Sequence, residues 1–444
     1  MGFFKAYDMR GTVGKDFDLA TVRGIGQALP QVVEGRRWLV GRDCRTTSQA
    51  VRDSLIEGLL AAGVEVFDLG PATTPMVYFA TAEGRFDGSV QITASHNPPS
   101  DNGLKVSRRG ALPVGYSTGL AEVERLVAAA DFKAVGGTGK VFEITGFKDC
   151  YVAWLKAHAG DGFDGLRFAV DCSDGMAGIL AHDLFGPDAI YLNDVPDGRF
   201  PHHSPNPLLD EAREQISAAV RENGLDCGVI FDGDADRCMF VDETGAFIQP
   251  DYLIPVLAST YPDRGGTVIH DVRTSRAAIE ALRADGYKPV MGKVGHAFAK
   301  LLLRETDAVC GGELAGHYYF RDFCHCDSGE LAALRLLGAF AKAKKNGLTV
   351  SKFLAPLTQK YANSGEMNFS VEDKQAAIAR VLDAAAGLGT PTGRSDIDGI
   401  RLEYAEGWVS VRQSNTEPLL RLIVECDTST RLKEWCAVLR NAVV

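Results

Sequence analysis

The chain has 444 residues, of which 45% are hydrophobic and 24% charged, and its formal net charge is −11. This length predicts several domains of roughly 150 residues each, and the negative charge argues against nucleic acid or an anionic membrane surface as the main partner. No apolar run approaches the roughly 18 residues that a membrane-spanning helix needs, so we expect a soluble protein without a membrane partner.

Residues 1–6, MGFFKA, lack the apolar segment of a secretory signal. The ten cysteines are scattered between Cys44 and Cys436 and form no compact framework. This pattern is typical of reduced thiols, so we expect a cytoplasmic protein.

A strand, helix, strand arrangement then occurs three times, and Ser or Thr residues stand where each helix should be capped. The copies comprise strands 38–40 and 64–68 around a helix from 46 to about 62, strands 168–170 and 189–192 around an apolar helix, and strands 267–269 and 288–291 around a helix that ends near 285. This alternation predicts βαβ units with parallel strands. We therefore expect three repeated α/β domains.

Each copy also has a later strand that leads into a polar loop. The loops carry, in chain order, Ser95 with His96 and Lys105; Asp232, Asp234 and Asp236 with Arg237; and Glu313 with Ala315 and His317. Loops at strand ends of a rigid α/β scaffold are the usual place for chemistry. The three loops are therefore predicted to share one cleft.

The second of these loops predicts a metal site. Asp232, Asp234 and Asp236 alternate, so a slightly curled loop can turn all three carboxylates toward one cation. A calcium EF-hand loop is excluded because its sixth position should be Gly and is Arg237. Mg²⁺ prefers a few carboxylates together with phosphate oxygens, so Ser95 is expected as a phosphoryl acceptor or a resident phosphoserine.

From about residue 363 the pattern changes. A helix at 373–386, strands at 408–411 and 420–424 and a closing helix at 430–443 predict a small α+β domain with antiparallel pairing. The loop between its strands carries Arg412, Ser414, Asn415 and Thr416. These donors suit a dianionic phosphate.

Lys293 and His296 form a further cationic cluster. The chain contains no G-x-x-x-x-G-K-[ST] and no G-x-G-x-x-G motif, so a nucleotide cofactor is not expected.

Four of these stretches, in this order, resemble the loops of the α-D-phosphohexomutases. Residues 93–98 resemble the family's phosphoserine loop, 232–237 its magnesium loop, 312–317 its sugar-binding loop and 412–418 its phosphate-binding loop, and residues 5–11 are similar to its opening. The resemblance implies three similar α/β domains with mixed sheets and a C-terminal α+β domain, arranged as a heart around a central cleft. The expected boundaries are 1–148, 149–249, 250–360 and 361–444.

The resemblance also implies a mechanism, in which phosphorylated Ser95, bound to Mg²⁺, phosphorylates one end of a hexose monophosphate. The resulting hexose 1,6-bisphosphate, which also serves as activator, turns around and returns its other phosphate to Ser95. Positive charge would come from Arg10, Lys105 and Arg237. His317 and Lys105 are the candidates for proton transfer.

Substrate binding is assigned by the same resemblance. The expected residues are Glu313, Ala315, Lys293 and His296 for the sugar and its phosphate, and Arg412, Ser414, Asn415 and Thr416 for the phosphate that does not react.

One departure concerns the sugar. The family commonly has Ser two residues after the Glu of its sugar-binding loop, and this chain has Ala315. Residues 318–323, YYFRDF, look most like the bacterial phosphomannomutases that feed GDP-mannose synthesis. We expect a phosphomannomutase, as a monomer or weak homodimer, with phosphoglucomutase or a dual enzyme as the alternative. A sugar-phosphate-binding protein without turnover and a metal-dependent phosphatase are the alternatives from other classes.

Overall fold

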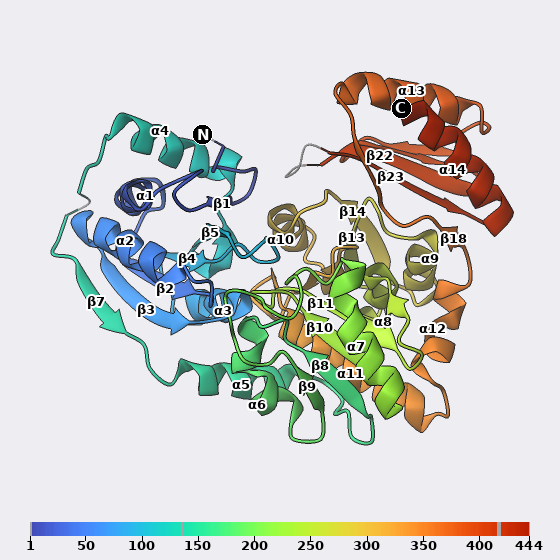
Figure 1. Ribbon diagram of the computed structural model, residues 1–444, viewed down its shortest axis with the longest axis horizontal. Coiled ribbons are helices and arrows are strands. Elements are labelled where there is room, and N and C mark those ends of the chain that lie inside the picture. Colours follow the sequence, from blue (N-terminus) through green and yellow to red (C-terminus); the bar gives the residue numbers. More distant parts are fainter. Residues whose placement is uncertain (1, 135, 415–418, 444) are drawn as a thin grey trace.

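The computed structural model describes residues 2–134, 136–414 and 419–443. Its strands form four sheets, and helices pack beside each sheet (Figure 1). We call the four sheets with their helices units I to IV, in chain order. No helix within the described ranges is both long and apolar enough to cross a membrane.

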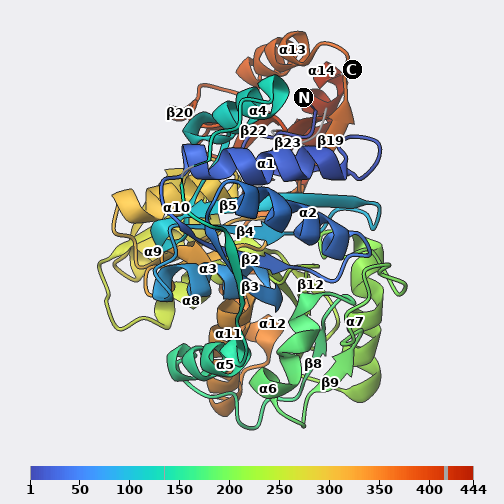
Figure 2. The same ribbon diagram turned by 90° about the vertical axis from the view of Figure 1, so that its left-hand side faces the viewer.

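Unit I contains a sheet of order β1-β5-β4-β2-β3-β7, with β6 paired to β5. Its strands are β1 (Met9–Thr12), β2 (Arg37–Arg42), β3 (Glu65–Pro71), β4 (Gly88–Ile92), β5 (Asp101–Arg108), β6 (Leu112–Pro113) and β7 (Lys140–Glu143). Its helices are α1 (Leu19–Val32), α2 (Ser48–Ala61), α3 (Thr74–Glu83) and α4 (Leu120–Ala129), with short turns η1 (Arg109–Ala111) and η2 (Tyr116–Thr118). Figure 2 shows α1 and α2 on the outer side of this sheet.

Unit II contains a smaller sheet of order β12-β11-β10-β8-β9. Its strands are β8 (Phe168–Asp171), β9 (Ile190–Leu192), β10 (Cys227–Phe231), β11 (Cys238–Asp242) and β12 (Phe247–Ile248). Its helices are α5 (Phe147–His158), α6 (Ala181–Phe185) and α7 (Asp210–Asn223), with the turn η3 (Met176–Ile179).

Unit III repeats this plan in the order β14-β13-β15-β16-β17. Its strands are β13 (Thr267–Asp271), β14 (Lys288–Gly292), β15 (Cys310–Gly312), β16 (Tyr318–Phe320) and β17 (Cys326–Asp327). Its helices are α8 (Leu253–Ser259), α9 (Arg276–Ala284), α10 (His296–Glu305), α11 (Gly329–Lys345) and α12 (Val350–Thr358), with the turn η4 (Pro250–Tyr252).

Unit IV has an antiparallel sheet of order β18-β23-β22-β21-β20, with β19 also paired to β23. Its strands are β18 (Ala362–Asn363), β19 (Met367–Ser370), β20 (Gly393–Ser395), β21 (Ile400–Glu403), β22 (Gly407–Gln413) and β23 (Leu419–Cys426). Its helices are α13 (Lys374–Ala386) and α14 (Ser429–Val443). The predicted α+β tail is confirmed, but it has more strands than the two expected.

The three predicted repeats are confirmed, and their sheets are mixed, as the family resemblance implied. In each unit a parallel core is extended by antiparallel strands, for example β5 on β4, β11 on β10 and β16 on β15. Each antiparallel partner follows its neighbour after only a short loop, and such a connection can reverse the chain but cannot make a parallel crossover. These short reversals are the loops in which the polar residues were found.

Two expectations about helix starts are wrong. Thr47, placed as a cap of α2, has a helical backbone, and its side chain accepts no capping hydrogen bond. The single apolar helix expected after β8 is divided at Leu180 into η3 and α6, and Ser173 and Asp174, both with φ of +53°, prevent a helix from starting before Met176. Left-handed residues interrupt a right-handed helix. Ser275 does cap α9, by accepting a bond from the Ala277 amide.

One hydrophobic cluster joins three of the four units. It contains buried residues of units I, II and III, among them Phe79, Phe231 and Phe340, and unit I also has a cluster of its own. Unit IV has a cluster of its own, built on residues such as Trp435 and Leu439. Units I to III are therefore fused through a common core, whereas unit IV is attached by other means.

Candidate active site

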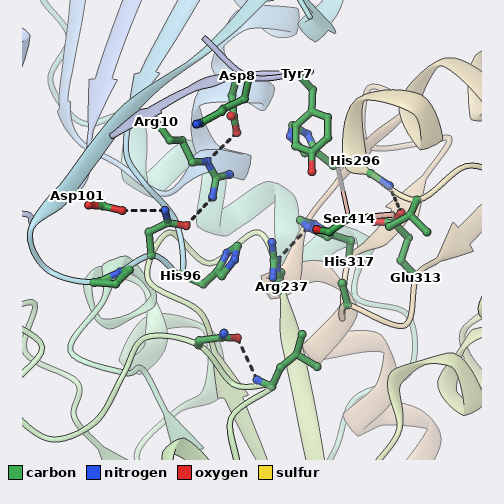
Figure 3. A pocket seen from close by; sticks show the side chains of 18 of the residues that line it. Tyr7, Asp8, Arg10, His96, Asp101, Arg237, His296, Glu313, His317 and Ser414 are labelled. Atoms are coloured by element: carbon green, nitrogen blue, oxygen red, sulfur yellow. Dashed lines mark hydrogen bonds and ion pairs between the residues drawn. The ribbon is translucent and has the colours of Figure 1, made fainter. Parts of the chain in front are cut away.

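All four units line one cleft of about 560 Å³. Unit I contributes Arg10 and Asn97, unit II Ser204 and Arg237, unit III Arg273 and Glu313, and unit IV Arg412 and Arg421. Figure 3 shows side chains from distant parts of the sequence converging on this space. The shared cleft predicted from the three loops is thus present in the structure.

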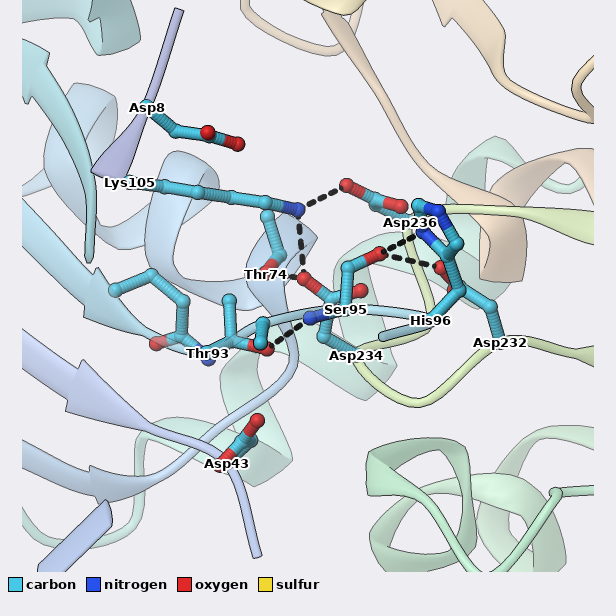
Figure 4. A network of polar contacts seen from close by, with 12 residues as sticks. Asp8, Asp43, Thr74, Thr93, Ser95, His96, Lys105, Asp232, Asp234 and Asp236 are labelled. Carbon is cyan, nitrogen blue, oxygen red and sulfur yellow. Dashed lines mark hydrogen bonds and ion pairs between the residues drawn. The ribbon is translucent and has the colours of Figure 1, made fainter. Parts of the chain in front are cut away.

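Ser95 lies just beyond β4 and directly before His96, which lines the cleft. It is only 1% exposed, and its φ of +52° is in the left-handed region, which is strained for a serine. Its amide donates to Thr93 Oγ1 (2.9 Å), and its Oγ donates to Asp232 Oδ2 (2.8 Å) and lies 3.3 Å from His96 Nδ1 (Figure 4). The strained turn therefore aims the hydroxyl at the acidic loop.

Asp232, Asp234 and Asp236 converge as the sequence predicted. Ala235 has φ of +62°, which curls the loop, and one carboxylate oxygen of each aspartate lies within 4.8 Å of the others. All three side chains are fully buried. Burial, reinforced by Asp236 and Asp234, raises the pKa of Asp232 well above its usual range.

The donor set fits a hard cation. Oδ1 of Asp234 and Oδ1 of Asp236 are buried and have no hydrogen-bond partner among the described residues. Buried carboxylate oxygens without a partner are costly, and an oxygen-seeking ion such as Mg²⁺ would satisfy them. The acidic loop, with Ser95 beside it, therefore has the chemistry of a magnesium site.

Lys105 forms ion pairs with two aspartates of the same loop. Its Nζ lies 2.7 Å from Asp234 Oδ2 and 2.5 Å from Asp236 Oδ2 (Figure 4). Burial acts to raise the pKa of Asp236, but the Lys105 ammonium outweighs burial and holds this pKa below its usual range. Lys105 thus compensates charge at the predicted metal site, a role that the sequence did not assign to it.

The sugar-binding loop supplies Glu313 in a fixed orientation. Glu313 Oε1 accepts a bond from the Gly295 amide (2.6 Å), and Oε2 accepts one from the Tyr319 hydroxyl (2.8 Å). Ala315 lines the cleft beside Glu313. Each carboxylate oxygen keeps a lone pair for a further hydroxyl donor.

Of the two residues in the predicted cationic cluster, His296 lines the cleft and Lys293 does not. His296 lines the cleft, is 5% exposed, and has no hydrogen-bond partner on either ring nitrogen among the described residues. Burial, with the nearby Lys300 charge, holds its pKa well below the usual range, so the ring is neutral. Lys293 is exposed, its Nζ lies 5.5 Å from the Phe298 ring centroid, and it does not line the cleft.

Three arginines meet Glu366 at the opposite end of the cleft. Glu366 Oε2 lies 3.2 Å from Arg412 and 3.4 Å from Arg273, and Oε1 lies 2.6 Å from Arg421. Arg273 is further paired with Asp271 at 2.7 Å. With three guanidinium groups and two carboxylates, this end of the cleft favours an anion.

Of the other residues predicted in the phosphate-binding loop, the structure describes Ser414. Ser414 lines the cleft, whereas Asn415 and Thr416 lie outside the described residues.

Positive charge also faces the cleft near Ser95. Arg10 Nη1 donates to Asn97 Oδ1 (3.1 Å), and its Nε is paired with Asp8 (2.8 Å). Arg237 donates from Nε to His317 Nε2 (2.9 Å) (Figure 3). Arg10 is thus held against the Ser95 loop, and Arg237 against the sugar-binding loop.

Several site residues were missed from the sequence, notably Arg45, Arg273, Glu366 and Arg421. Arg45 is 2% exposed and donates to the carbonyls of Ser95, Asn97, Pro98 and Asp101. One signal was available, because Asp-x-Arg follows the first strand of two of the copies, at Asp43 and at Asp271.

Comparison with known proteins agrees with this arrangement. Residues 1–134, 151–245 and 249–361 match domains described as alpha/beta/alpha domains I, II and III of phosphoglucomutase/phosphomannomutase, and residues 366–442 match the C-terminal domain of the same family. The chain is 37% identical over 434 residues to a phosphomannomutase of Salmonella montevideo, covering 95% of this chain and 94% of the relative. It is 38% identical over 439 residues to a protein of Xanthomonas campestris pv. campestris named "Phosphohexose mutases", covering 97% and 96%.

A solved structure agrees as well. A phosphoglucomutase/phosphomannomutase family protein of Burkholderia thailandensis superposes with a TM-score of 0.88 at 31% identity, covering 100% of this chain and 97% of that chain. These matches identify the protein as a phosphohexomutase, an isomerase that acts on sugar phosphates. The chain belongs to the phosphoglucomutase/phosphomannomutase family, the α-D-phosphohexomutases.

Proposed function

We propose that this phosphohexomutase is a phosphomannomutase, which interconverts mannose 6-phosphate and mannose 1-phosphate and supplies GDP-mannose synthesis. The supporting observation is that one cleft is lined by His96 and Arg237, which adjoin Ser95 and the acidic loop, and by the arginines that meet Glu366. The choice of mannose rests on the relative named phosphomannomutase. The relative named for phosphohexoses in general keeps glucose as the second candidate.

Ser95 is the phosphate carrier in the reaction that we infer. The bond from phosphorus to Ser95 Oγ breaks as a bond forms from phosphorus to a sugar hydroxyl oxygen; the sugar hydroxyl loses its proton, and Ser95 Oγ takes one up. Mg²⁺ bound by Asp232, Asp234, Asp236 and phosphorylated Ser95 would neutralise charge on the phosphoryl oxygens.

The chain's own cations act on the same group. Arg10, bonded to Asn97, and Arg237, beside Asp232, both line the cleft and would stabilise the equatorial oxygens. Lys105 and His317 are the candidates for proton transfer. Burial acts to lower the pKa of Lys105, but the charges of Asp234 and Asp236 outweigh burial and raise it. Lys105 is therefore better suited to donate a proton than to act as a base. His96 would stay neutral beside Ser95, because burial and the Arg237 charge hold its pKa well below the usual range.

Substrate reversal uses the two ends of the cleft. Arg412 and Ser414, with Asn415 and Thr416, would hold the phosphate that is not reacting, while Glu313 and His296 bind the sugar. The hexose 1,6-bisphosphate then turns so that its other phosphate faces Ser95. The same contacts therefore serve the 1-phosphate and the 6-phosphate.

We also infer domain boundaries at 1–148, 149–249, 250–360 and 361–444, and a monomer or weak homodimer. The ten cysteines are unpaired, which supports reduced thiols and a cytoplasmic location.

Coupled assays with mannose 1-phosphate and glucose 1-phosphate, each with its 1,6-bisphosphate and Mg²⁺, test the proposal. We expect a higher kcat/KM for mannose 1-phosphate, phosphate on Ser95 by mass spectrometry, and loss of nearly all turnover in Ser95→Ala. Ser100→Ala, an exposed serine of the same loop, is the matched control. A preference for glucose 1-phosphate would replace the proposed substrate, and full activity of Ser95→Ala would remove the phosphoserine mechanism.

A further inference from the structure

A line of four buried polar side chains leads from the core of unit III to the acidic loop. Lys300 Nζ lies 2.8 Å from Asp327 Oδ1, and Asp327 Oδ2 lies 2.7 Å from His317 Nδ1. His317 Nε2 accepts a hydrogen bond from Arg237 Nε (2.9 Å). All four residues are less than 9% exposed. The line thus ends on Arg237, which lines the cleft beside Asp232 and Asp236.

The contacts determine where the proton of His317 sits. A guanidinium group can only donate, so His317 Nε2 must carry a lone pair rather than a proton. In a neutral ring the proton then lies on Nδ1, and Asp327 Oδ2 lies 2.7 Å away, although this contact does not have hydrogen-bond geometry. The buried Asp327 charge beside Nδ1 therefore acts electrostatically and favours the tautomer that can accept from Arg237.

The other carboxylate oxygen of Asp327 is paired with a lysine. The Lys300 ammonium pairs with Oδ1 and also lies 3.6 Å from the centroid of the Tyr78 ring. A buried carboxylate needs such a compensating charge. Asp327, His317 and Asp236 also have ligand atoms close enough together to hold a metal. However, Asp327 Oδ1 is paired with Lys300, and Nδ1 of His317 carries a proton, so neither atom is available as a ligand.

We propose that Asp327, supported by Lys300, is a positioning residue that fixes the tautomer of His317 and thereby aims the Arg237 guanidinium at the transferring phosphoryl group. The inference rests on the proposed phosphoryl transfer at Ser95, but not on which hexose is preferred. It also assigns His317 a positioning role. The Nε2 lone pair that would take a substrate proton is bonded to Arg237, and the bond would have to break first.

Asp327→Asn tests the tautomer directly. An asparagine amide can turn its N–H toward Nδ1, which moves the proton to Nε2 and sets two donors, Nε2–H and the Arg237 Nε–H, against each other. We expect kcat to fall by about 10²- to 10⁴-fold. KM should change less than about threefold, because the arginines around Glu366 are untouched. A kcat within threefold of wild type would overturn the proposal.

A spectroscopic readout separates this role from a merely structural one. In ¹⁵N-detected histidine spectra we expect His317 as the Nδ1–H tautomer in the wild type and as Nε2–H in Asp327→Asn, with the resonance assigned through His317→Gln. A wild-type ring protonated at Nε2 would overturn the proposal. Because this measurement needs no substrate, it stands apart from any failure of the sugar assays.

A double-mutant cycle shows whether the effect passes through Arg237. On an Arg237→Gln background, Asp327→Asn should lower kcat by no more than about threefold further. A persisting loss of 10²-fold would mean that His317 acts on the substrate itself and would refute the proposal. Asp327→Glu should recover part of the rate. Asp322→Asn, a more exposed carboxylate of the same segment, is the control, and thermal unfolding verifies that each variant folds.

Discussion

At Glu366 one carboxylate neutralises only part of the charge of three arginines. Arg412 is 3% exposed, and Nε of Arg412 has no hydrogen-bond partner among the described residues. A buried donor of this kind gains most when an anion binds, because a charge-assisted hydrogen bond contributes about 1.5–3 kcal/mol. The Glu366 cluster is therefore suited to bind and release a phosphate.

For Arg412→Gln we expect KM for hexose phosphate to rise by about 10- to 100-fold, which corresponds to one such bond. The fall in kcat should be smaller, because Arg412 belongs to unit IV and is paired with Glu366, whereas Ser95 belongs to unit I. Steady-state kinetics measure both. Arg394→Gln, on an exposed strand of the same unit, is the matched control. An unchanged KM would show that Arg412 does not bind the phosphate.

A second prediction concerns Asp251, which is fully buried in η4. Its Oδ2 accepts a bond from the Ser275 amide (2.8 Å), and Oδ1 has no hydrogen-bond partner among the described residues. Burial raises the pKa of Asp251 to about 7, above the value of about 3.8 for the free carboxyl. The folded state thus holds this proton more tightly than the unfolded state. The stabilisation is complete below pH 4 and is lost as the pH rises to about 7.

Thermal unfolding of the wild type at pH 5 and pH 8 should show this loss, on the order of 2–3 kcal/mol from Asp251. Asp251→Asn removes the titrating group. The change in melting temperature between pH 5 and pH 8 should therefore be smaller in Asp251→Asn than in the wild type, by at least about 3 °C. Asp263→Asn, an exposed carboxylate of the same unit, should behave like the wild type. Equal pH dependence in all three proteins would contradict the assignment.

At the scale of the elements, the three repeats share one turn. Each turn begins with an aspartate that ends or directly follows the first strand of the repeat, and Oδ1 of this aspartate accepts a bond from the amide two residues later. The pairs are Asp43 with Arg45 (3.0 Å), Asp171 with Ser173 (2.8 Å) and Asp271 with Arg273 (2.7 Å).

Each turn then holds the neighbouring polar loop. Arg45 binds carbonyls of the Ser95 loop, and Ser173 Oγ donates to the Phe231 carbonyl (2.6 Å), which directly precedes the acidic loop. Asp271 Oδ2 accepts from the Leu314 amide (3.1 Å) in the sugar-binding loop. The adjacent parallel strands bring turn and loop together, so one local pattern supports three different chemistries.

Arg45→Lys tests the first of these turns. A single ammonium cannot reach the four carbonyls that the planar guanidinium satisfies. We expect the free energy of unfolding to fall by about 2–4 kcal/mol and kcat to fall at least tenfold. Hydrogen exchange should quicken for residues 94–101. Arg23→Lys, on an exposed helix face, is the control. Normal exchange in this segment together with normal kcat would contradict the role of Arg45.

At the scale of the whole molecule, unit IV is held to unit III by reciprocal arginines. Arg401 of unit IV donates to the carbonyls of Val272 (2.7 Å) and Thr274 (2.9 Å). Arg276 of unit III donates to the carbonyls of Tyr404 (2.8 Å) and Gly407 (2.9 Å). Because unit IV has a separate core, these polar contacts set its position relative to the cleft.

Arg401→Met should therefore let unit IV move while leaving both cores intact. Small-angle scattering without substrate should give a larger radius of gyration, and kcat/KM should fall about tenfold, mostly through KM. Added hexose phosphate should restore the compact form. Arg394→Met is the control for loss of a surface arginine from unit IV. Identical scattering curves for the wild type and Arg401→Met would contradict this view of the interface.

The parts of the site that lie within one loop were predictable from the residues in order. Ser95, the three alternating aspartates and Glu313 each directly follow a strand with an apolar pattern, so strand and chemistry can be read together. The βαβ repeats were found for the same reason. The short strands β18 and β20 of unit IV, with two and three residues, were missed because so few residues show no period-two pattern.

The residues that hold the site together depend on contacts between distant parts of the chain. Glu366, Arg421 and Asp327 are ordinary charged residues in the sequence, and their roles arise from what burial places beside them. Lys293 was grouped with His296 by proximity in the sequence, yet only His296 lines the cleft. Local sequence thus specifies the strands and the reactive groups at their ends. Long-range packing decides which charges are paired in the interior, because a buried charge is stable only where the fold brings it a partner.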